Sequence, residues 1–127
     1  MITVGQVMKT NLLAVDKDTS VEEAAKLMRA CSVGGMLITS ANRLIGIVTE
    51  SDIVKKVVAA QRAPYLVPVE TIMSSPIVGI EEDRPLTHAA ALMKENHTRH
   101  LSVTKDDAVV GILSVRDLLH PVAIDDF

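Results

Sequence analysis

The pattern of apolar and polar positions predicts a strand and then a helix near the start of the chain. The apolar run LLAV at 12–15 is consistent with a short buried strand. A polar turn follows, and Ser20 with Glu23 has the spacing of a capping box that begins a helix. Apolar residues then recur at helical spacing in one narrow stripe, at Val21, Ala24, Ala25, Met28 and Cys31. We expect this stripe, Cys31 included, to be buried.

A hairpin and a second helix are predicted next. The apolar runs MLIT at 36–39 and LIGIV at 44–48 flank the polar turn SANR, which is typical of two antiparallel strands. Thr49 follows the second run directly and is expected to cap a helix over 50–62, before Pro64. The first half of the chain therefore reads strand, helix, strand, strand, helix.

The second half predicts the same elements in the same order. The run IVGI at 77–80 is the first strand, and Pro85 suits the first turn of the helix after it. The apolar stripe of that helix consists of Leu86, Ala89, Ala90 and Met93. The runs at 101–104 and 108–113 form the hairpin, and Pro121 is expected to end the last helix.

A shift of 65 residues superposes the two halves without a gap between residues 7 and 54. A short motif, Gly-apolar-apolar-Thr/Ser-x-x-Asp, coincides in both halves: Gly46 with Gly111, Thr49 with Ser114, and Asp52 with Asp117. Internal repetition is a stronger fold signal than any single motif. We expect an α/β protein of two β-α-β-β-α repeats, 1–64 and 65–127, with small mixed sheets packed together about a pseudo-twofold axis.

Composition and charge narrow the classes of function. The 127 residues carry a net charge of −3 with scattered cations and only 2% aromatic residues, which disfavours nucleic-acid binding. No apolar run is long enough to span a membrane, and the N-terminus does not have the pattern of a signal peptide. A lone Cys31 fits the cytoplasm. We expect no metal site and no enzyme, because His97 and His100 have no partnering ligands and no catalytic set emerges.

The duplicated motif, with the Ala-Ala-x-x-Met helix before it, resembles the CBS domain, which is named after cystathionine β-synthase. The resemblance extends from about Val4 to His120. CBS domains usually occur as a tandem pair, called a Bateman module, and such pairs commonly bind AMP, ADP, ATP or S-adenosylmethionine in clefts between the repeats. The resemblance thus implies a stand-alone regulatory module whose ligand is an adenine nucleotide and which requires no cofactor.

Carried onto this sequence, the resemblance gives each motif residue a role in ligand binding. Ribose would be bound by Asp52 and Asp117, phosphate by Thr49 and Ser114, and adenine by Ile47 and Ile112. These roles agree with elementary chemistry, because a helix N-terminus attracts phosphate and an ionised carboxylate accepts hydrogen bonds from a ribose diol. The alternative is that each Thr/Ser-x-x-Asp only caps its helix, and both roles can hold together.

The repeats differ where basic residues of the family often contact phosphate. The second repeat has Arg99 and His100 before its hairpin, whereas the first repeat has Gly34 and Gly35. Arginine binds phosphate through a planar fork of donors, and glycine cannot neutralise an anion. We therefore expect two unequal clefts, with the phosphorylated ligand on the side of Arg99 and the other cleft weaker, empty or suited to a less charged ligand. The alternative is a solvated Arg99 and a His100 that packs at a helix–strand corner.

The residues before each first strand are further candidates, because ligands in the family often contact the backbone there. They are Thr10, Asn11, Ser75 and Pro76. A turn-capping role for Thr10 and Ser75 is the alternative. The sequence leaves open which of these segments lies with which aspartate.

A homodimer is also expected, because the helix over 50–62 carries more apolar residues than one buried stripe needs. They are Ile53, Val54, Val57 and Val58. Family members often dimerise through such helices, and a monomer with well-buried helices is the alternative. Two other functions stay open: a dimerisation or interaction module without nucleotide, which would act on itself or on a separate target protein, and an S-adenosylmethionine binder, which Gly34 and Gly35 would suit.

Overall fold

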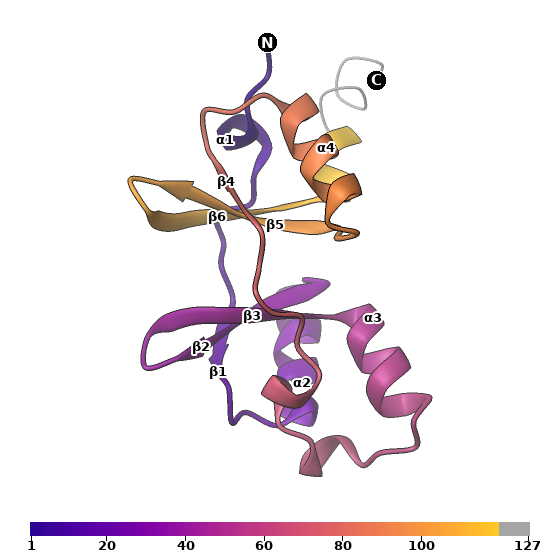
Figure 1. Ribbon diagram of the computed structural model, residues 1–127. Helices are drawn as coiled ribbons and strands as arrows, with labels where there is room; N and C mark the ends of the chain where they lie inside the picture. Colours follow the sequence, from indigo (N-terminus) through magenta and orange to yellow (C-terminus); the bar gives the residue numbers. More distant parts are fainter. Residues whose placement is uncertain (120–127) are drawn as a thin grey trace. The chain divides into compact units, whose positions relative to one another are not determined.

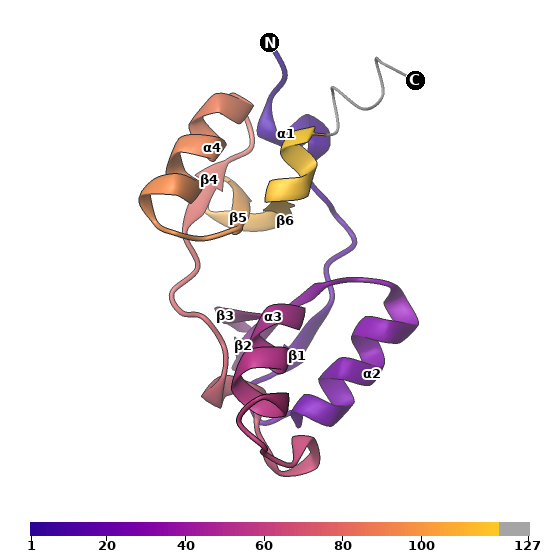
Figure 2. The ribbon, with the colours of Figure 1, turned by 90° about the vertical axis from the view of Figure 1, so that its right-hand side faces the viewer.

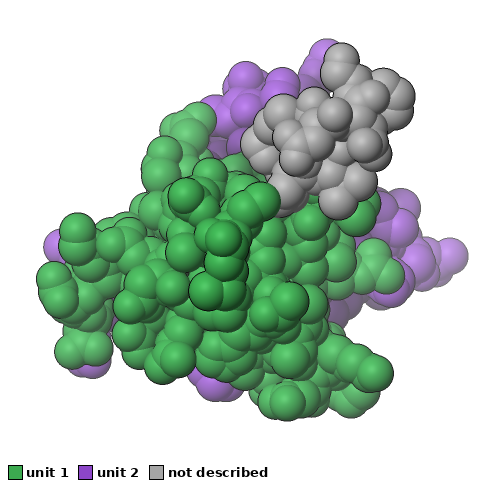
Figure 3. Space-filling view, turned by 90° about the horizontal axis from the view of Figure 1, so that it is seen from above, with its two compact units in different colours: residues 1–12, 77–127 green, residues 13–76 purple. Residues whose placement is uncertain are grey.

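The computed structural model describes residues 1–119, and these divide into two compact units. Unit 2 is the continuous segment 13–76, whereas unit 1 combines residues 1–12 with the chain from residue 77 onward. Figure 3 colours the two units separately. Each unit contains one three-stranded mixed sheet, which confirms the predicted α/β class with two small mixed sheets. His120 and Pro121, which were expected to end the repeat and its last helix, lie outside the described residues.

Unit 2 contains most of the first repeat. Its sheet has the order β1 (Ala14–Asp16), β2 (Gly35–Ser40) and β3 (Arg43–Thr49), with β1 parallel and β3 antiparallel to β2. Its helical segments are α2 (Val21–Cys31), α3 (Glu50–Ile53), the π-helical turn η1 (Val54–Val58), and the 3₁₀ turns η2 (Pro64–Leu66) and η3 (Val69–Thr71). The Ser20 hydroxyl accepts a hydrogen bond from the Glu23 N–H, as an N-cap does.

The core of unit 2 lies between its sheet and its helices. Figures 1 and 2 show α2 and α3 on the same face of the sheet. Alternate residues of β2 point to that face, where Met36 and Ile38 pack against Val21 and Met28 of α2. Val57 of η1 is also fully buried there. The alternate apolar residues of the strand and the apolar stripe of the helix therefore pack into one layer.

Unit 1 contains most of the second repeat in the same arrangement. Its sheet has the order β4 (Gly79–Glu81), β5 (His100–Lys105) and β6 (Ala108–Ser114). Its helical segments are α1 (Val4–Val7), α4 (Leu86–Glu95) and the 3₁₀ turn η4 (Val115–Leu119). Pro85 is the N-cap of α4 rather than a residue of its first turn. Ala89 and Met93 of α4 pack with Leu101, Val103 and Leu113 in the core.

The compact units do not follow the expected repeat boundary at 64/65, because the opening segments are exchanged. Val4 of the first repeat is fully buried in unit 1, where its N–H donates to the carbonyl of Arg84 over 2.8 Å. Val69, its equivalent, is fully buried in unit 2, where its N–H donates to the carbonyl of Thr19, also over 2.8 Å. Burial of each valine contributes about 1.5–3 kcal/mol. Each repeat therefore completes its core with the segment that opens the other repeat.

Two local expectations were wrong. The helix over 50–62 is not one regular α-helix, because it changes after Ile53 to a π-helical turn in which the Ala59 N–H bonds the Val54 carbonyl over 2.8 Å. The apolar stripe of α2 is also narrower than expected, and Cys31 is exposed at its last turn. The chain turns at Ser32, whose positive φ of 54° ends α2 directly after the exposed cysteine.

Candidate functional site

The glycine of each duplicated motif allows another part of the chain to lie directly on its strand. We call residues 8–10 and 73–75 the edge segments. A Cβ atom at Gly111 would lie 2.5 Å from the Met8 sulfur and 3.0 Å from the Lys9 carbonyl oxygen. A Cβ atom at Gly46 would lie 2.5 Å from the Met73 sulfur and 2.9 Å from the carbonyl oxygen of Ser74. The motif therefore has glycine because a methyl group does not fit there.

Each edge segment is held by one antiparallel bridge to the last strand of its unit. In unit 1, Lys9 and Ile112 exchange two N–H···O bonds of 2.9 Å. In unit 2, Ser74 and Ile47 do the same at 2.9 and 3.1 Å. This places residues 8–10 in the unit that contains Asp117, and residues 73–75 in the unit that contains Asp52. The question of which segment lies with which aspartate, open from the sequence, is thus answered.

Asp117 is the more buried of the two motif aspartates. It is 6% exposed, and its Oδ2 accepts bonds from the Ser114 N–H at 2.8 Å and the Ser114 hydroxyl at 3.2 Å. Its Oδ1 lies 3.3 Å from the ammonium nitrogen of Lys9, whose side chain is 65% exposed. One carboxylate oxygen therefore fixes the start of η4, and the other faces a cation on the edge segment.

Asp52 repeats this arrangement in unit 2 with a different lysine. Its Oδ2 accepts from the Thr49 N–H at 3.0 Å and the Thr49 hydroxyl at 3.2 Å, and the Thr49 hydroxyl accepts from the Asp52 N–H. Its Oδ1 lies 3.1 Å from Lys56, one helical turn later. The Lys56 ammonium also donates to the Ile72 carbonyl over 2.9 Å. Lys56 thus links the start of α3 to Ile72, the residue that follows η3.

The capping interpretation of Thr/Ser-x-x-Asp is confirmed at Thr49 and Asp52, which form a reciprocal capping box. Ser114 and Asp117 make the matching bonds from serine to aspartate. The threonine and serine hydroxyls both donate to their aspartates, so phosphate would have to compete for them. The ribose and phosphate roles from the resemblance stay predictions. In each unit the ribose role concerns Oδ1 of the aspartate, and the phosphate role concerns the threonine or serine hydroxyl.

The basic pair of the second repeat lies where the sequence placed it. The carbonyl of Arg99 accepts from the Val115 N–H at 2.9 Å, and its side chain is exposed. His100 pairs with Ser114 across β5 and β6. In unit 2 the Gly34 carbonyl accepts from the Glu50 N–H at 3.0 Å, which is the same contact without a basic side chain. Arg99 and Gly34 therefore make the same backbone contact in their units, and only Arg99 adds a positive charge.

The remaining predicted residues lie on or next to the edge segments and strands. Thr10, Asn11 and Pro76 are exposed, whereas the Ser75 hydroxyl donates to the Ile45 carbonyl over 2.6 Å. Ile47 is 6% exposed and Ile112 is half-buried. The Ser75 hydroxyl is therefore engaged with β3, a strand 30 residues earlier in the chain, rather than with the backbone of a local turn.

Sequence reasoning missed Lys9 and Lys56, the two lysines that pair with the aspartates. Lys56 follows Asp52 by four residues, a spacing that places both side chains on one helix face, so the sequence carried a signal. Lys9 precedes Asp117 by 108 residues. Only the bridge between the edge segment and β6 brings this pair together.

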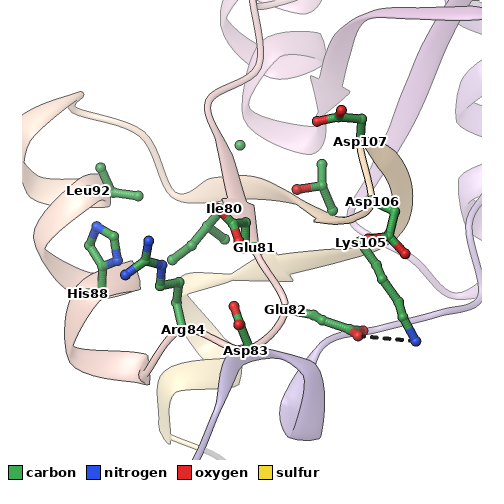
Figure 4. Close-up of a pocket in the computed structure, with 12 residues that line it drawn as sticks. Ile80, Glu81, Glu82, Asp83, Arg84, His88, Leu92, Lys105, Asp106 and Asp107 are labelled. Atoms are coloured by element: carbon green, nitrogen blue, oxygen red, sulfur yellow. Dashed lines mark ion pairs between the residues drawn. The ribbon is translucent and has the colours of Figure 1, made fainter.

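A separate hollow of about 670 Å³ lies in unit 1, between β4, α4 and the turn after β5 (Figure 4). Acidic and basic side chains line it together, among them Glu81, Asp83, Arg84 and His88. Lys105 pairs with Glu82 at its rim over 3.6 Å. None of the predicted ligand residues lines this hollow, which is therefore distinct from the candidate site.

The part of the chain that the structure describes holds neither a metal-binding cluster nor a membrane-spanning helix. No three of its His, Cys, Asp and Glu side chains are grouped so that they could hold a metal ion. None of its helices combines the length and the apolar character that a membrane span needs.

Two units built on one repeat, each with a capped aspartate beside an edge segment, define a tandem α/β pair. Comparison with protein families matches the CBS domain twice, over residues 4–59 and 69–123. The chain belongs to the CBS-domain family, and it contains two such domains in tandem. CBS pairs are regulatory ligand-binding modules.

Relatives and solved structures agree with this assignment. A 17.7 kDa protein of Acidianus ambivalens is 38% identical over 117 residues, which cover 91% of this chain and 70% of that protein. The structure of a CBS-domain protein from Burkholderia ambifaria MC40-6 matches with a TM-score of 0.91 and 31% identity, over 99% of this chain and 97% of that one. The CBS pair of protein MJ0100, solved with 5′-methylthioadenosine and S-adenosyl-L-methionine, has the same fold (TM-score 0.83, 24% identity, 98% of each chain).

The glycine contacts generate a prediction about stability. Gly46→Ala should lower the free energy of unfolding by about 1–3 kcal/mol, because the new methyl group meets backbone at Ser74 and forces the edge segment away. Gly34→Ala is the matched control in the same unit, since its Cβ would meet nothing closer than 3.6 Å. Denaturant unfolding of both variants measures the difference, and equal stability of the two would refute the close-contact explanation.

Proposed function

We propose that this CBS pair is a non-catalytic regulatory module that binds an adenine nucleotide such as AMP, ADP or ATP. The observation that carries the proposal is the geometry of Asp117. One of its carboxylate oxygens is fixed by Ser114, and the other faces an exposed lysine that a ligand can displace. A buried carboxylate held in this way accepts hydrogen bonds, and the cis-diol of ribose supplies two donors. In this proposal the nucleotide is the regulatory ligand, and no other cofactor is required.

The charge difference between the units supports a phosphorylated ligand at unit 1. The exposed Arg99 lies next to the Ser114–Asp117 turn, where its guanidinium can bind a phosphate. Gly34 occupies the equivalent position in unit 2 and leaves no cation there. Unit 2 therefore suits a less charged adenosine compound. Because the MJ0100 pair was solved with S-adenosyl-L-methionine and 5′-methylthioadenosine, binding of both compounds should be tested beside AMP, ADP and ATP.

Self-association is a second candidate function, and exposed apolar side chains favour it. In the segment predicted as a helix over 50–62, Val54 is 58% exposed and Val58 is 64% exposed. Leu119, the equivalent of Val54 in the second repeat, is 66% exposed. An apolar side chain thus reaches solvent at the same repeat position twice, which favours a homodimer built on the segments after each motif.

Asp117→Ala should weaken binding of AMP about ten- to a hundredfold, because the ribose loses a charged acceptor. Isothermal titration calorimetry measures the affinity, and thermal unfolding checks that loss of the cap has not unfolded the unit. Asp83→Ala is the control, since that exposed carboxylate lies in the separate hollow. Unchanged affinity in both Asp117→Ala and Asp52→Ala would contradict the ribose role. A larger effect of Asp83→Ala would move the site to the hollow.

Arg99→Ala should weaken AMP binding about tenfold or more and leave adenosine nearly unaffected, because only the phosphate loses its partner. The effect should shrink as salt rises, since screening weakens exposed charge pairs. Arg116→Ala, which removes another exposed arginine in η4, serves as the control. Equal losses of AMP and adenosine in Arg99→Ala would identify Arg99 as a structural residue.

Light scattering of the purified protein at micromolar concentration should give the mass of a dimer. Val58→Glu should shift it toward monomer, because a charge would then be buried at the contact. Ile2→Glu, which alters another exposed apolar residue, should leave the dimer intact. A monomer in the unmodified protein, with and without AMP, would exclude self-association through these side chains.

A further inference from the structure

The two lysines that pair with the motif aspartates differ in how firmly they are held. Lys56 bonds both Asp52 and the Ile72 carbonyl, and its side chain is 47% exposed. Within residues 1–119, Lys9 pairs only with Asp117, at 3.3 Å, and its side chain is 65% exposed. With one partner instead of two and a more exposed side chain, the Lys9 ammonium exchanges partners more readily than the Lys56 ammonium. Lys56 is a structural tie, whereas Lys9 is a movable counter-ion.

The backbone of Lys9 is nevertheless fixed. Its N–H and carbonyl both bond Ile112, and the glycine at position 111 holds the segment against β6. The Lys9 backbone is therefore fixed beside β6, and only the side chain is free to change its conformation. On the other side of β6 lies β5, which pairs His100 with Ser114 and brings Arg99 to the same turn. Lys9 and Arg99, which both carry cationic side chains, are thus each held by backbone hydrogen bonds next to the Ser114–Asp117 turn.

The repeat offers an internal comparison, because unit 2 has the same backbone without these cations. Ser74 is the equivalent of Lys9 and makes the same bridge to the strand, and Gly34 is the equivalent of Arg99. Neither can neutralise a phosphate. The backbone is therefore the same in both units, but only unit 1 carries cationic side chains, Lys9 and Arg99, at these two positions.

We propose that Lys9 is a specificity-determining residue that makes the unit 1 site select phosphorylated over neutral adenosine compounds. This inference rests on the proposed function and deepens it. In the free protein the Lys9 ammonium occupies Asp117 Oδ1, so a ribose diol must displace it. A ligand with a phosphate gives the released ammonium a new partner, and the charge stays compensated. Adenosine displaces the ammonium and offers nothing in return, so its binding carries an uncompensated loss.

The test measures AMP and adenosine affinities by calorimetry in the unmodified protein and in Lys9→Met. The variant keeps the backbone bridge and the length of the stem but has no charge. We expect AMP to bind about tenfold more weakly, whereas adenosine holds its affinity or binds more tightly, because its competitor for Asp117 is gone. Lys9→Arg, which keeps the charge, should preserve the preference for AMP. The salt dependence of AMP binding should decrease in Lys9→Met.

Lys26→Met is the matched control. Lys26 lies 3.3 Å from Glu22 and is 64% exposed, so the distance and the exposure of the lysine match those of Lys9, but it belongs to α2 and its partner is 43% exposed. It should change neither affinity. Lys56→Met should lower the melting temperature, since it removes a bond to Ile72.

The outcomes separate this inference from the proposed function. If the unmodified protein binds no adenosine compound, both are overturned. If it binds AMP and adenosine equally, or if Lys9→Met changes both affinities by the same factor while the protein stays folded, the role of Lys9 is overturned and the proposed function stands. A fall in AMP affinity alone supports both.

Discussion

The contact between each edge segment and the glycine of its motif is the constraint from which the other features of both units follow. At Gly46 and Gly111 a methionine sulfur and a backbone carbonyl occupy the space of a side chain. The two-way bridge then fixes the segment on the last strand of the sheet. Because the preceding residues include Val4 or Val69, this docking also delivers a fully buried valine to each core. A small unit with few large apolar side chains depends strongly on such contributions.

The same contact prepares the candidate site. It brings Lys9 to Asp117, and it brings the 73–75 segment to β3, two residues before the cap of α3. The caps orient both carboxylates in the same way, with Oδ2 on the backbone N–H of the threonine or serine. The duplicated backbone therefore presents one design twice, and the side chains placed on it make the two copies chemically different.

Capping and ligand binding are compatible in this geometry because a carboxylate has two oxygens. The cap needs one of them, and it holds the group rigidly where a ligand could use the other. In the ligand-free protein the lysine next to Oδ1 offsets the charge of the carboxylate. This matters most for Asp117, because that residue is only 6% exposed. The proposed exchange of the lysine for a ligand would redistribute charge without opening the fold.

The sequence by itself determined the features that depend on near neighbours. The strands of each hairpin, the caps at Ser20 and Thr49, and the repeat in register all follow from local spacing, and the duplicated motif identified the family. Tertiary structure decided the exchange of opening segments, the π-helical turn after Ile53, and the exposure of Cys31. It also decided the pairing of Lys9 with Asp117, which no pattern of spacing could indicate. These features depend on which distant segment covers a given strand, and a backbone contact at a glycine leaves no periodic signal along the chain.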